Sequence, residues 1–221
     1  MLLFPSMAQE EKIGNRWVKE KETPRHILNQ KADKKLDYVA DLYCKVINER
    51  MIGRKSELLK KNLYFEGFRY ISYLNLSYTY ENRLWAFSYN LNYKTSIDAP
   101  DSQKGLGKCS FAVKNSGKMR IEDARWYDDG SSCSREAADH FLKMLNNRLI
   151  VDRIVSLDMT NVRLTFNPDT MQWSVSCRTL IGSTTWILIP PVMSLIKPRL
   201  EECARMLEFM ELTADAVINK K

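Results

Sequence analysis

The sequence has 221 residues, of which 44% are hydrophobic and 28% charged, and its formal net charge is +7. This composition excludes a wholly disordered chain and is typical of one or two globular domains. The longest apolar stretch, 186–196, contains two prolines and is too short for a transmembrane helix. The N-terminus lacks the basic start and long apolar region of a secretory signal, so we expect a cytoplasmic protein.

The cysteines and histidines argue against common metal and catalytic sites. The five cysteines are widely spaced and include no CxxC pair, which predicts reduced thiols rather than disulfides or structural zinc. The two histidines, His26 and His140, form no metal-binding motif. Because no nucleophile, base and orienting group can be assembled from the sequence, we predict neither an enzyme nor a bound cofactor.

The N-terminal quarter carries most of the positive charge, because residues 1–62 contain 14 Lys and Arg against 9 Asp and Glu. Residues 1–32 show no sustained apolar period and predict a flexible basic arm. Asp33 can cap a helix that begins at Lys34, and apolar residues recur at helical spacing as far as Met51. Gly53 is a natural helix stop, and we expect a short basic helix after it.

An antiparallel hairpin over residues 74–93 is the strongest structural signal in the chain. On either side of a polar turn at 81–83, apolar and aromatic residues alternate with short polar ones. This period of two predicts two strands with one apolar and one polar face. We expect helices to cover the aromatic residues of the apolar face, which are Tyr78, Tyr80, Trp85, Phe87 and Tyr89.

The rest of the chain shows the same helical spacing and the same strand period of two. A loop at 95–107 follows the hairpin and is rich in turn-forming residues. The elements expected after it are two short strands near 108–114 and 119–127, a helix that begins at the serine cluster 131–134 and continues to Leu149, a hairpin around the turn 167–169, an apolar segment at 185–189, and a last helix after Pro198.

These elements predict an α+β fold of two layers, in which about three helices cover one face of a largely antiparallel sheet of about six to seven strands. We assign residues 33–221 to a single domain. The two hairpins resemble each other, so two similar halves, 33–130 and 131–221, are an alternative. Shared strand physics explains the resemblance more simply than an internal duplication.

One candidate site lies where the second predicted helix begins. A helix N-terminus attracts anions and lowers the pKa of a thiol, which suggests a small anion site or a reactive cysteine. The alternative, which we favour, is a capping segment in which a serine accepts a backbone hydrogen bond. The residues concerned are Ser131, Ser132, Cys133 and Ser134.

A second candidate site is the densest basic cluster in the chain, formed by Arg50, Arg54, Lys55, Lys60 and Lys61. With the nearby Tyr64 and Phe65, this basic patch suggests nucleic-acid binding through phosphate contacts and base stacking.

The polar face of the strands is unusual because its side chains are short and mostly neutral, where a solvent face ordinarily carries more Lys and Glu. Such a face suits a wet contact with another sheet, a subunit or an extended peptide. Its residues are Asn75, Ser77, Thr79, Ser88, Asn90, Asn92, Ser174 and Ser176. The alternative, which we favour from the sequence alone, is a face simply exposed to solvent.

The order helix, strands, helix, strand pair, helix resembles the layout of type III secretion chaperones. That resemblance implies a partner segment docked on the sheet or in a helix groove. Our leading hypothesis is therefore a non-enzymatic protein-binding adaptor whose partner is another protein or a second copy of the chain. The alternatives are a nucleic-acid-binding protein that uses the basic patch, and a small-molecule or lipid pocket beneath the aromatic hairpin.

Overall fold

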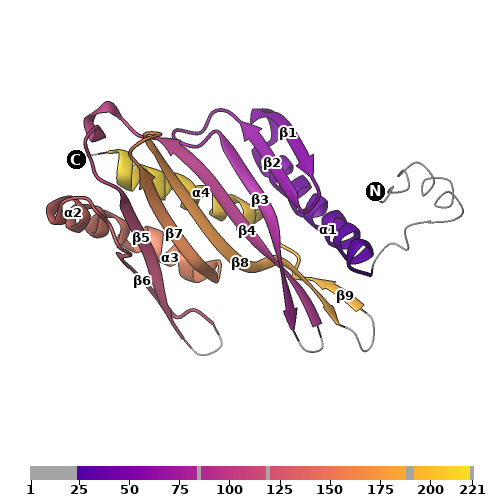
Figure 1. Cartoon of the computed structure of the whole chain (residues 1–221). Helices are drawn as coiled ribbons and strands as arrows, with labels where there is room; N and C mark the ends of the chain where they lie inside the picture. The colour runs from indigo at the N-terminus through magenta and orange to yellow at the C-terminus, as the bar shows by residue number, and fades with distance from the viewer. Residues whose placement is uncertain (1–23, 84–85, 118–119, 188–191, 220–221) are drawn as a thin grey trace, which may run out of the picture.

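The computed structural model describes residues 24–83, 86–117, 120–187 and 192–219. Within these residues the strands form one antiparallel sheet, and the α-helices lie against one of its faces (Figure 1). No described helix covers the opposite face (Figure 1). The predicted α+β fold is confirmed. The helices are α1 (Pro24–Ile47), α2 (Arg135–Leu145), α3 (Arg148–Ser156) and α4 (Leu200–Ile218).

The sheet is larger than the six to seven strands predicted, since the described residues form nine. Their order across the sheet is β1-β2-β3-β4-β8-β7-β5-β6, and β9 pairs with β8 beside this path. All pairings are antiparallel. The strands are β1 (Met51–Glu57), β2 (Lys60–Phe65), β3 (Tyr73–Arg83), β4 (Ala86–Asp98), β5 (Cys109–Ser116), β6 (Asp123–Asp128), β7 (Met159–Asn167), β8 (Gln172–Ile187) and β9 (Val192–Leu195).

The prediction of a short helix after Gly53 is wrong, because this segment forms the β1–β2 hairpin. In β2, Leu63 and Phe65 are buried together with Lys61, which is only 2% exposed. The Lys61 ammonium group lies 3.0 Å from Asp33 and 3.2 Å from Asp37, both in α1. The side chains of β2 therefore alternate between inward and outward positions. Because a lysine occupies one inward position, the hydrophobic pattern of the sequence does not show this alternation.

Helix α1 begins at Pro24, earlier than the predicted start at Lys34, so residues 24–32 are helical and not part of an arm. Proline suits the first turn of a helix because its missing N–H has no intrahelical partner there. Asp33 lies inside α1 and does not cap it; its carboxylate accepts a hydrogen bond from the Leu59 N–H at 2.7 Å. The predictions for residues 1–23 lie outside the described residues.

The single helix predicted after the serine cluster is two helices, α2 and α3. Asn147 separates them and caps α3, where its side chain accepts a hydrogen bond from the Leu149 N–H at 2.9 Å. The last helix, α4, begins after Pro198 as predicted. The two short strands and the second hairpin are confirmed as β5, β6, β7 and β8.

The two halves suggested by the similar hairpins are interleaved in the sheet. Strands β4 and β8, the second strands of the two hairpins, pair directly, while β5 and β6 lie beyond β7. Strands of 33–130 therefore lie on both sides of strands from 131–221. This arrangement favours one domain with a continuous core over two structural units.

The core lies between the sheet and the helices. Trp173 of β8 is fully buried, and its ring packs against those of Phe111, Phe141 and Phe166, with centroids 5.0–6.4 Å away. Its indole N–H donates to the buried Gln103 side chain at 2.8 Å, so the polar atom of the ring is satisfied.

The aromatic hairpin β3–β4 packs as predicted where the structure describes it. Tyr78 and Tyr89 are 7% and 0% exposed, and the hydroxyl of Tyr89 donates to Asn29 of α1 at 2.8 Å. Tyr80 and Phe87 are half-buried and stack on each other. Burial raises the pKa of Tyr78 above its ordinary value. Trp85 lies outside the described residues.

Candidate functional site

The uncovered face of the sheet presents the short polar residues of the central strands. Strand register aligns two of them, Asn75 of β3 and Ser176 of β8, in one row with the cations Lys94 of β4 and Arg163 of β7. Each is half-buried or exposed, whereas the residues before and after each in its strand, such as Leu74, are buried. The alternation of the strands thus produces this surface directly.

An asparagine network holds the neighbouring side chains in place. The Asn92 amide nitrogen donates to the Thr79 hydroxyl at 2.8 Å and to the Asn90 carbonyl at 2.9 Å. The Arg178 guanidinium donates to the Asn92 side-chain oxygen at 3.3 Å and to Glu81 at 2.6 Å. These contacts fix a polar surface whose own charges, at Arg178 and Glu81, are paired.

Lys94 and Arg163 differ from Arg178 in having no acidic partner among the described residues. Both side chains are exposed and flank Ser176, one strand to either side. They line a shallow hollow of about 550 Å³ with Asn75, Ser77 and Asn161. Because strands are about 4.8 Å apart, the two Cα atoms are separated by roughly 10 Å. An anionic group above Ser176 would lie within reach of both cations.

The basic patch predicted from the sequence is largely neutralised by acids of the same chain. Arg54 pairs with Asp37 and, at 2.6 Å, with Asp41, and Lys61 is buried beside Asp33. The remaining members have their own contacts: Lys55 and Lys60 lie 3.4 and 3.7 Å from Glu57, and Arg50 stacks over Phe68. The register places Arg50 and Lys60 toward opposite ends of the β1–β2 hairpin, so the five cations do not form a common free surface.

The segment Ser131, Ser132, Cys133 and Ser134 is held by hydrogen bonds to the end of the loop before β5 and to α2. Ser134 caps α2 by accepting from the Ala137 N–H at 3.2 Å, the alternative favoured from the sequence. The backbone N–H of Ser131 donates to Asp128 at 2.8 Å, and that of Ser132 to the Lys108 carbonyl at 2.7 Å. These two donors are therefore engaged within the chain.

Cys133 lies beside a second thiol, Cys109 of β5. Burial first, and then a hydrogen bond with Cys133, raise the pKa of the Cys109 thiol. A raised pKa keeps a thiol protonated and poorly nucleophilic. The reactivity of Cys133 itself stays a prediction.

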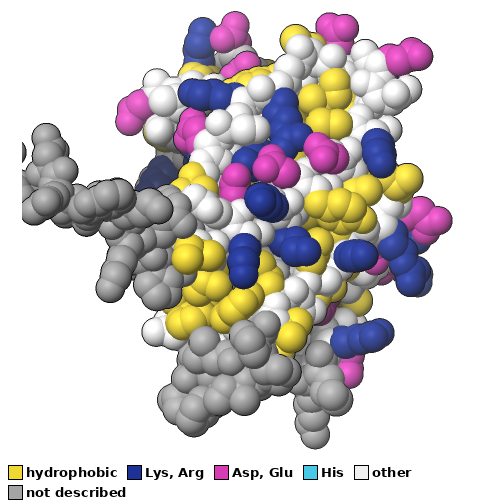
Figure 2. Space-filling model, turned by 90° about the vertical axis from the view of Figure 1, so that its right-hand side faces the viewer, with side chains coloured by type: hydrophobic (Ala, Val, Ile, Leu, Met, Phe, Trp, Pro, Cys, Tyr) yellow, Lys and Arg dark blue, Asp and Glu magenta, His cyan; other side chains and the backbone are white. Residues whose placement is uncertain are grey.

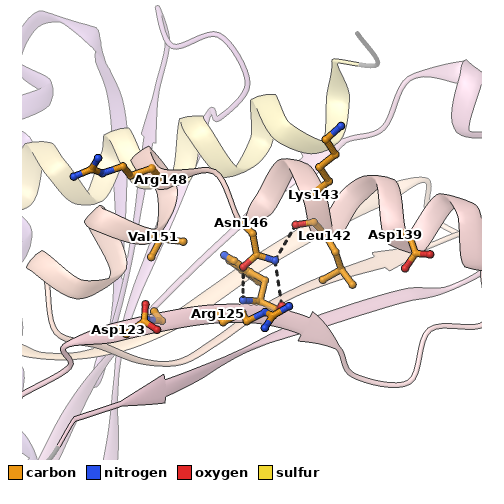
Figure 3. Close-up of a pocket in the computed structure, with 10 residues that line it drawn as sticks. Asp123, Arg125, Asp139, Leu142, Lys143, Asn146, Arg148 and Val151 are labelled. Carbon is orange, nitrogen blue, oxygen red and sulfur yellow. Dashed lines mark hydrogen bonds between the residues drawn. The ribbon is translucent and has the colours of Figure 1, made fainter.

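A further hollow, of about 580 Å³, lies between β6 and the corner joining α2 to α3 (Figure 3). Asn146 projects from this corner toward β6 and accepts from the Trp126 N–H at 2.9 Å while donating to the carbonyls of Leu142 and Trp126 (Figure 3). Its charged lining mixes both signs, with Asp123 and Asp139 beside Arg125, Lys143 and Arg148. Asn146 connects α2 to β6 through these hydrogen bonds, so the polar group in this hollow has a structural role.

The space beneath the aromatic hairpin is filled. A cavity between α1, α4 and the sheet, lined by Tyr43, Tyr93 and Cys203, has a volume of about 10 Å³. This volume accommodates no more than one water molecule. A small-molecule or lipid pocket in this position would require the core to open.

The described residues contain no group of three or more His, Cys, Asp and Glu side chains arranged to hold a metal ion. None of the described helices combines the length and apolar character needed to span a membrane.

These features define an α+β protein built on one antiparallel sheet, with helices on one face and a polar surface on the other. The chain belongs to the family described as protein of unknown function (DUF3156), whose sequence model matches residues 60–217. The matched segment includes β2 through most of α4, with Lys94, Arg163 and Ser176, and leaves out α1 and β1. Searches of curated proteins and of solved structures found no match.

Sequence reasoning identified most neutral residues of the uncovered face, but it was wrong for Ser88 and Asn90, which are buried beside a bulge at Tyr89–Leu91 that interrupts the alternation. It also missed Lys94 and Arg163, the two cations of the row that have no acidic partner among the described residues. Lys94 and Arg163 occupy polar positions of two different hairpins, so the alternation alone places each of them outward. Their common row depends on β4 and β7 both pairing with β8, which the local pattern does not specify. The sequence did contain a signal for these cations. Lys94 and Arg163 each occupy an outward position of a strand with no acidic residue at the adjacent positions of that strand.

Proposed function

We propose that the chain is a non-enzymatic binding module that docks an acidic segment of a partner protein on the uncovered face of its sheet. The observation that carries this proposal is the row Asn75, Lys94, Ser176 and Arg163, where two cations that pair with no acid of the described residues flank a small neutral residue.

The chemistry of the face favours a polypeptide over a compact small molecule. Its hollow is shallow and polar, whereas small-molecule sites are concave and mostly apolar. Short Asn, Ser and Thr side chains allow a partner backbone to approach closely and offer donors and acceptors to it. Protein interfaces commonly contain bridging water between such groups.

The charge of the face favours an acidic partner segment. Lys94 and Arg163 are both available to a carboxylate, and the Arg guanidinium can bind one in a bidentate manner. Because both groups are exposed in the free chain, pairing them on binding carries a smaller desolvation cost than pairing buried charges.

The alternative of nucleic-acid binding is less well supported, because Arg54 and Lys61 are engaged by α1 and Phe65 is buried, although Tyr64 is 41% exposed. The resemblance to type III secretion chaperones remains a likeness of layout, and it agrees with docking on the sheet. Self-association through the same face is an outcome that the experiment below distinguishes.

The proposal is tested by selecting binders from a random displayed peptide library on the full chain. We expect enrichment of Asp and Glu among the selected peptides. The affinity of one selected peptide, measured by fluorescence polarisation, should fall at least tenfold in the double variant Lys94→Glu/Arg163→Glu, equivalent to about 1.4 kcal/mol or more.

The matched control is Lys143→Glu/Arg205→Glu, which makes the same charge change at exposed residues of α2 and α4. Its affinity should stay within twofold of the unmodified chain. Equal loss in both variants, or selected peptides without acidic enrichment, contradicts the proposal. Sedimentation velocity without peptide shows whether the face instead binds a second copy.

A further inference from the structure

Helix α1 presents three distinct faces. Its apolar face, which includes Leu36 and Tyr43, packs in the core. Its acidic face, Asp33, Asp37 and Asp41, binds Arg54 and Lys61 of the β1–β2 hairpin.

The third face of α1 carries Lys31, Lys34, Lys35 and Tyr38, whose spacing places them on one side of the helix. Lys31 and Lys34 are exposed, Lys35 is half-buried, and Tyr38 is 40% exposed. This basic face is directed away from the β1–β2 hairpin that neutralises the acidic one.

The basic face of α1 borders the paired ends of β8 and β9. Register and alternation turn Trp186, Met193 and Leu195 toward α1. The Lys31 ammonium group lies 4.8 Å from the centroid of the Trp186 ring, within cation–π distance. Together with Lys197, these side chains and the basic face of α1 line a hollow of about 610 Å³, which we call the lysine groove.

The other side of the same strand pair is apolar as well. Ile187 and Val192 are directly opposite each other in the register and are 42% and 50% exposed, and the adjacent Ile196 is 50% exposed. The end of β8–β9 therefore exposes apolar side chains on both of its sides. Figure 2 views the molecule from the side where α1 lies in Figure 1. Hydrophobic side chains gather beside Lys and Arg side chains on the lower part of that view.

The positive charge of the lysine groove is not compensated locally. None of Lys31, Lys34, Lys35 and Lys197 forms an ion pair with an acid of the described chain. The acids Asp33, Asp37 and Asp41 lie on a neighbouring face of α1, where Arg54 and Lys61 bind them. The groove thus combines four like charges with an apolar rim.

We propose that the lysine groove and the exposed end of β8–β9 dock the protein on the surface of a bilayer containing anionic lipids. Peripheral membrane contacts combine aliphatic and Trp side chains, which enter the interface, with Lys side chains that attract anionic headgroups. Ile187, Val192 and Ile196 supply the first kind of contact, and the four lysines supply the second.

The lysine groove and the aliphatic side chains on the other side of β8–β9 together favour a bilayer over other anionic partners. Tyr38 and Trp186 are rings of the kind that stack on bases, but the exposed Ile187, Val192 and Ile196 have no role in a nucleic-acid site. A second copy of the chain docked symmetrically would bring four lysines against four lysines, which repel.

The test is co-sedimentation of the full chain with phosphatidylcholine vesicles that contain or lack 30% phosphatidylglycerol. We expect binding only to the anionic vesicles, weakening as salt is raised. Removing one lysine near the surface should weaken partitioning by about fivefold, so Lys31→Gln/Lys34→Gln/Lys35→Gln should weaken it by about a hundredfold.

Two further variants make the result specific. Lys108→Gln/Lys114→Gln/Lys143→Gln makes the same charge change at exposed sites elsewhere and should leave most of the partitioning intact. Ile187→Ser/Val192→Ser keeps all the lysines and should still weaken partitioning at least tenfold, because it removes the apolar contact. Circular dichroism confirms that each variant is folded.

Several outcomes overturn the proposal. They are equal binding to both vesicle types, no binding to anionic vesicles at 50 mM salt, equal loss in the two lysine triple variants, or no effect of Ile187→Ser/Val192→Ser. Binding of a 20-nucleotide single strand that competes with the vesicles and is insensitive to the Ile187→Ser/Val192→Ser change assigns the groove to nucleic acid instead.

Discussion

The two faces of the sheet are made by the same strands yet differ in almost every physical property. Residues such as Trp173, Val175 and Cys177 of β8 are buried against the helices, while Ser174 and Ser176 between them are only half-buried on the uncovered face. Large apolar side chains stabilise the fold on one side, and short polar ones leave the other side free to bind. In one strand, alternate residues can therefore serve different purposes: the inward ones stabilise the fold and the outward ones are available for recognition.

The largest expected difference between the faces is at Trp173. Trp173→Ala removes a fully buried ring and leaves the Gln103 side chain without its donor, so we expect the free energy of unfolding to fall by about 4 kcal/mol. Ser174→Ala, on the adjacent residue of the uncovered face, should change it by less than about 0.5 kcal/mol. Urea denaturation followed by circular dichroism measures both. Similar losses at the two positions would show that the uncovered face is packed as well.

We expect the next largest loss of stability at Lys61, because it is a charged residue buried on the covered face. Lys61→Ala leaves Asp33 and Asp37 without their buried cation and should destabilise the fold by about 2 kcal/mol, less than a fully buried pair would because both acids are partly exposed.

The control for this prediction is Lys60→Ala, which removes the adjacent, exposed lysine of the same strand. It should cost less than about 0.5 kcal/mol, since Lys60 and its partner Glu57 are both exposed. A destabilisation no larger at Lys61 than at Lys60, in the same urea titration, would mean that the Lys61 ion pairs add nothing to stability.

The buried thiols of the covered face make stability depend on pH. Burial raises the pKa of Cys177, and it raises that of Cys203 to about 12. An unfolded thiol has a pKa of about 8.5, so the contribution of each group is complete below that pH. It is lost as the pH rises toward the folded-state value, by up to about 1.4 kcal/mol per pH unit.

This dependence is measured by urea denaturation at pH 8 and pH 10 under reducing conditions. Cys177→Ala should reduce the fall in the free energy of unfolding between these pH values by about 1.4–2 kcal/mol. An identical fall in the unmodified chain and the variant would show that the Cys177 thiol ionises equally in both states.

The smallest stability effect is expected on the uncovered face itself. Lys94→Glu/Arg163→Glu should change the free energy of unfolding by less than about 0.5 kcal/mol, because neither side chain pairs with an acid of the described residues. The same variant should lose peptide binding, so stability and function separate. A destabilisation above 1.5 kcal/mol would assign these cations a structural role.

The sequence was informative wherever a signal was local. The period of two over 74–93 predicted which side chains of β3 and β4 face the helices, and Tyr78 and Tyr89 confirm it. It failed at 51–65, where Lys61 occupies an inward position, and at the start of α1, where the charged residues of 24–35 concealed a helix. At 51–65, ion pairs of Arg54 and Lys61 with acids of α1 replace apolar contacts, and such pairs are not visible in a hydrophobic pattern.

The candidate sites follow the same division. Most neutral residues of the uncovered face were identified from alternation, except Ser88 and Asn90 beside the β4 bulge. The pairing of β4 with β8 was not identified, so the row joining Lys94 to Arg163 could not be predicted. The basic patch is the reverse case, because it was predicted from the sequence but is neutralised in the structure. Its residues are close in sequence, whereas the acids of α1 that neutralise it became neighbours only through folding.

The sequence by itself determined the fold class, most helix and strand segments, and most of the inward residues of the central strands, because these depend on side-chain order within a few residues. Only the tertiary structure decided the order of the strands, the burial of Lys61, Ser88 and Asn90, and the position of Lys94 and Arg163 beside Ser176 with no acidic partner in the described part of the chain. Those features arise from contacts between segments far apart in the chain, which form where packing brings the segments together rather than where a local period places them.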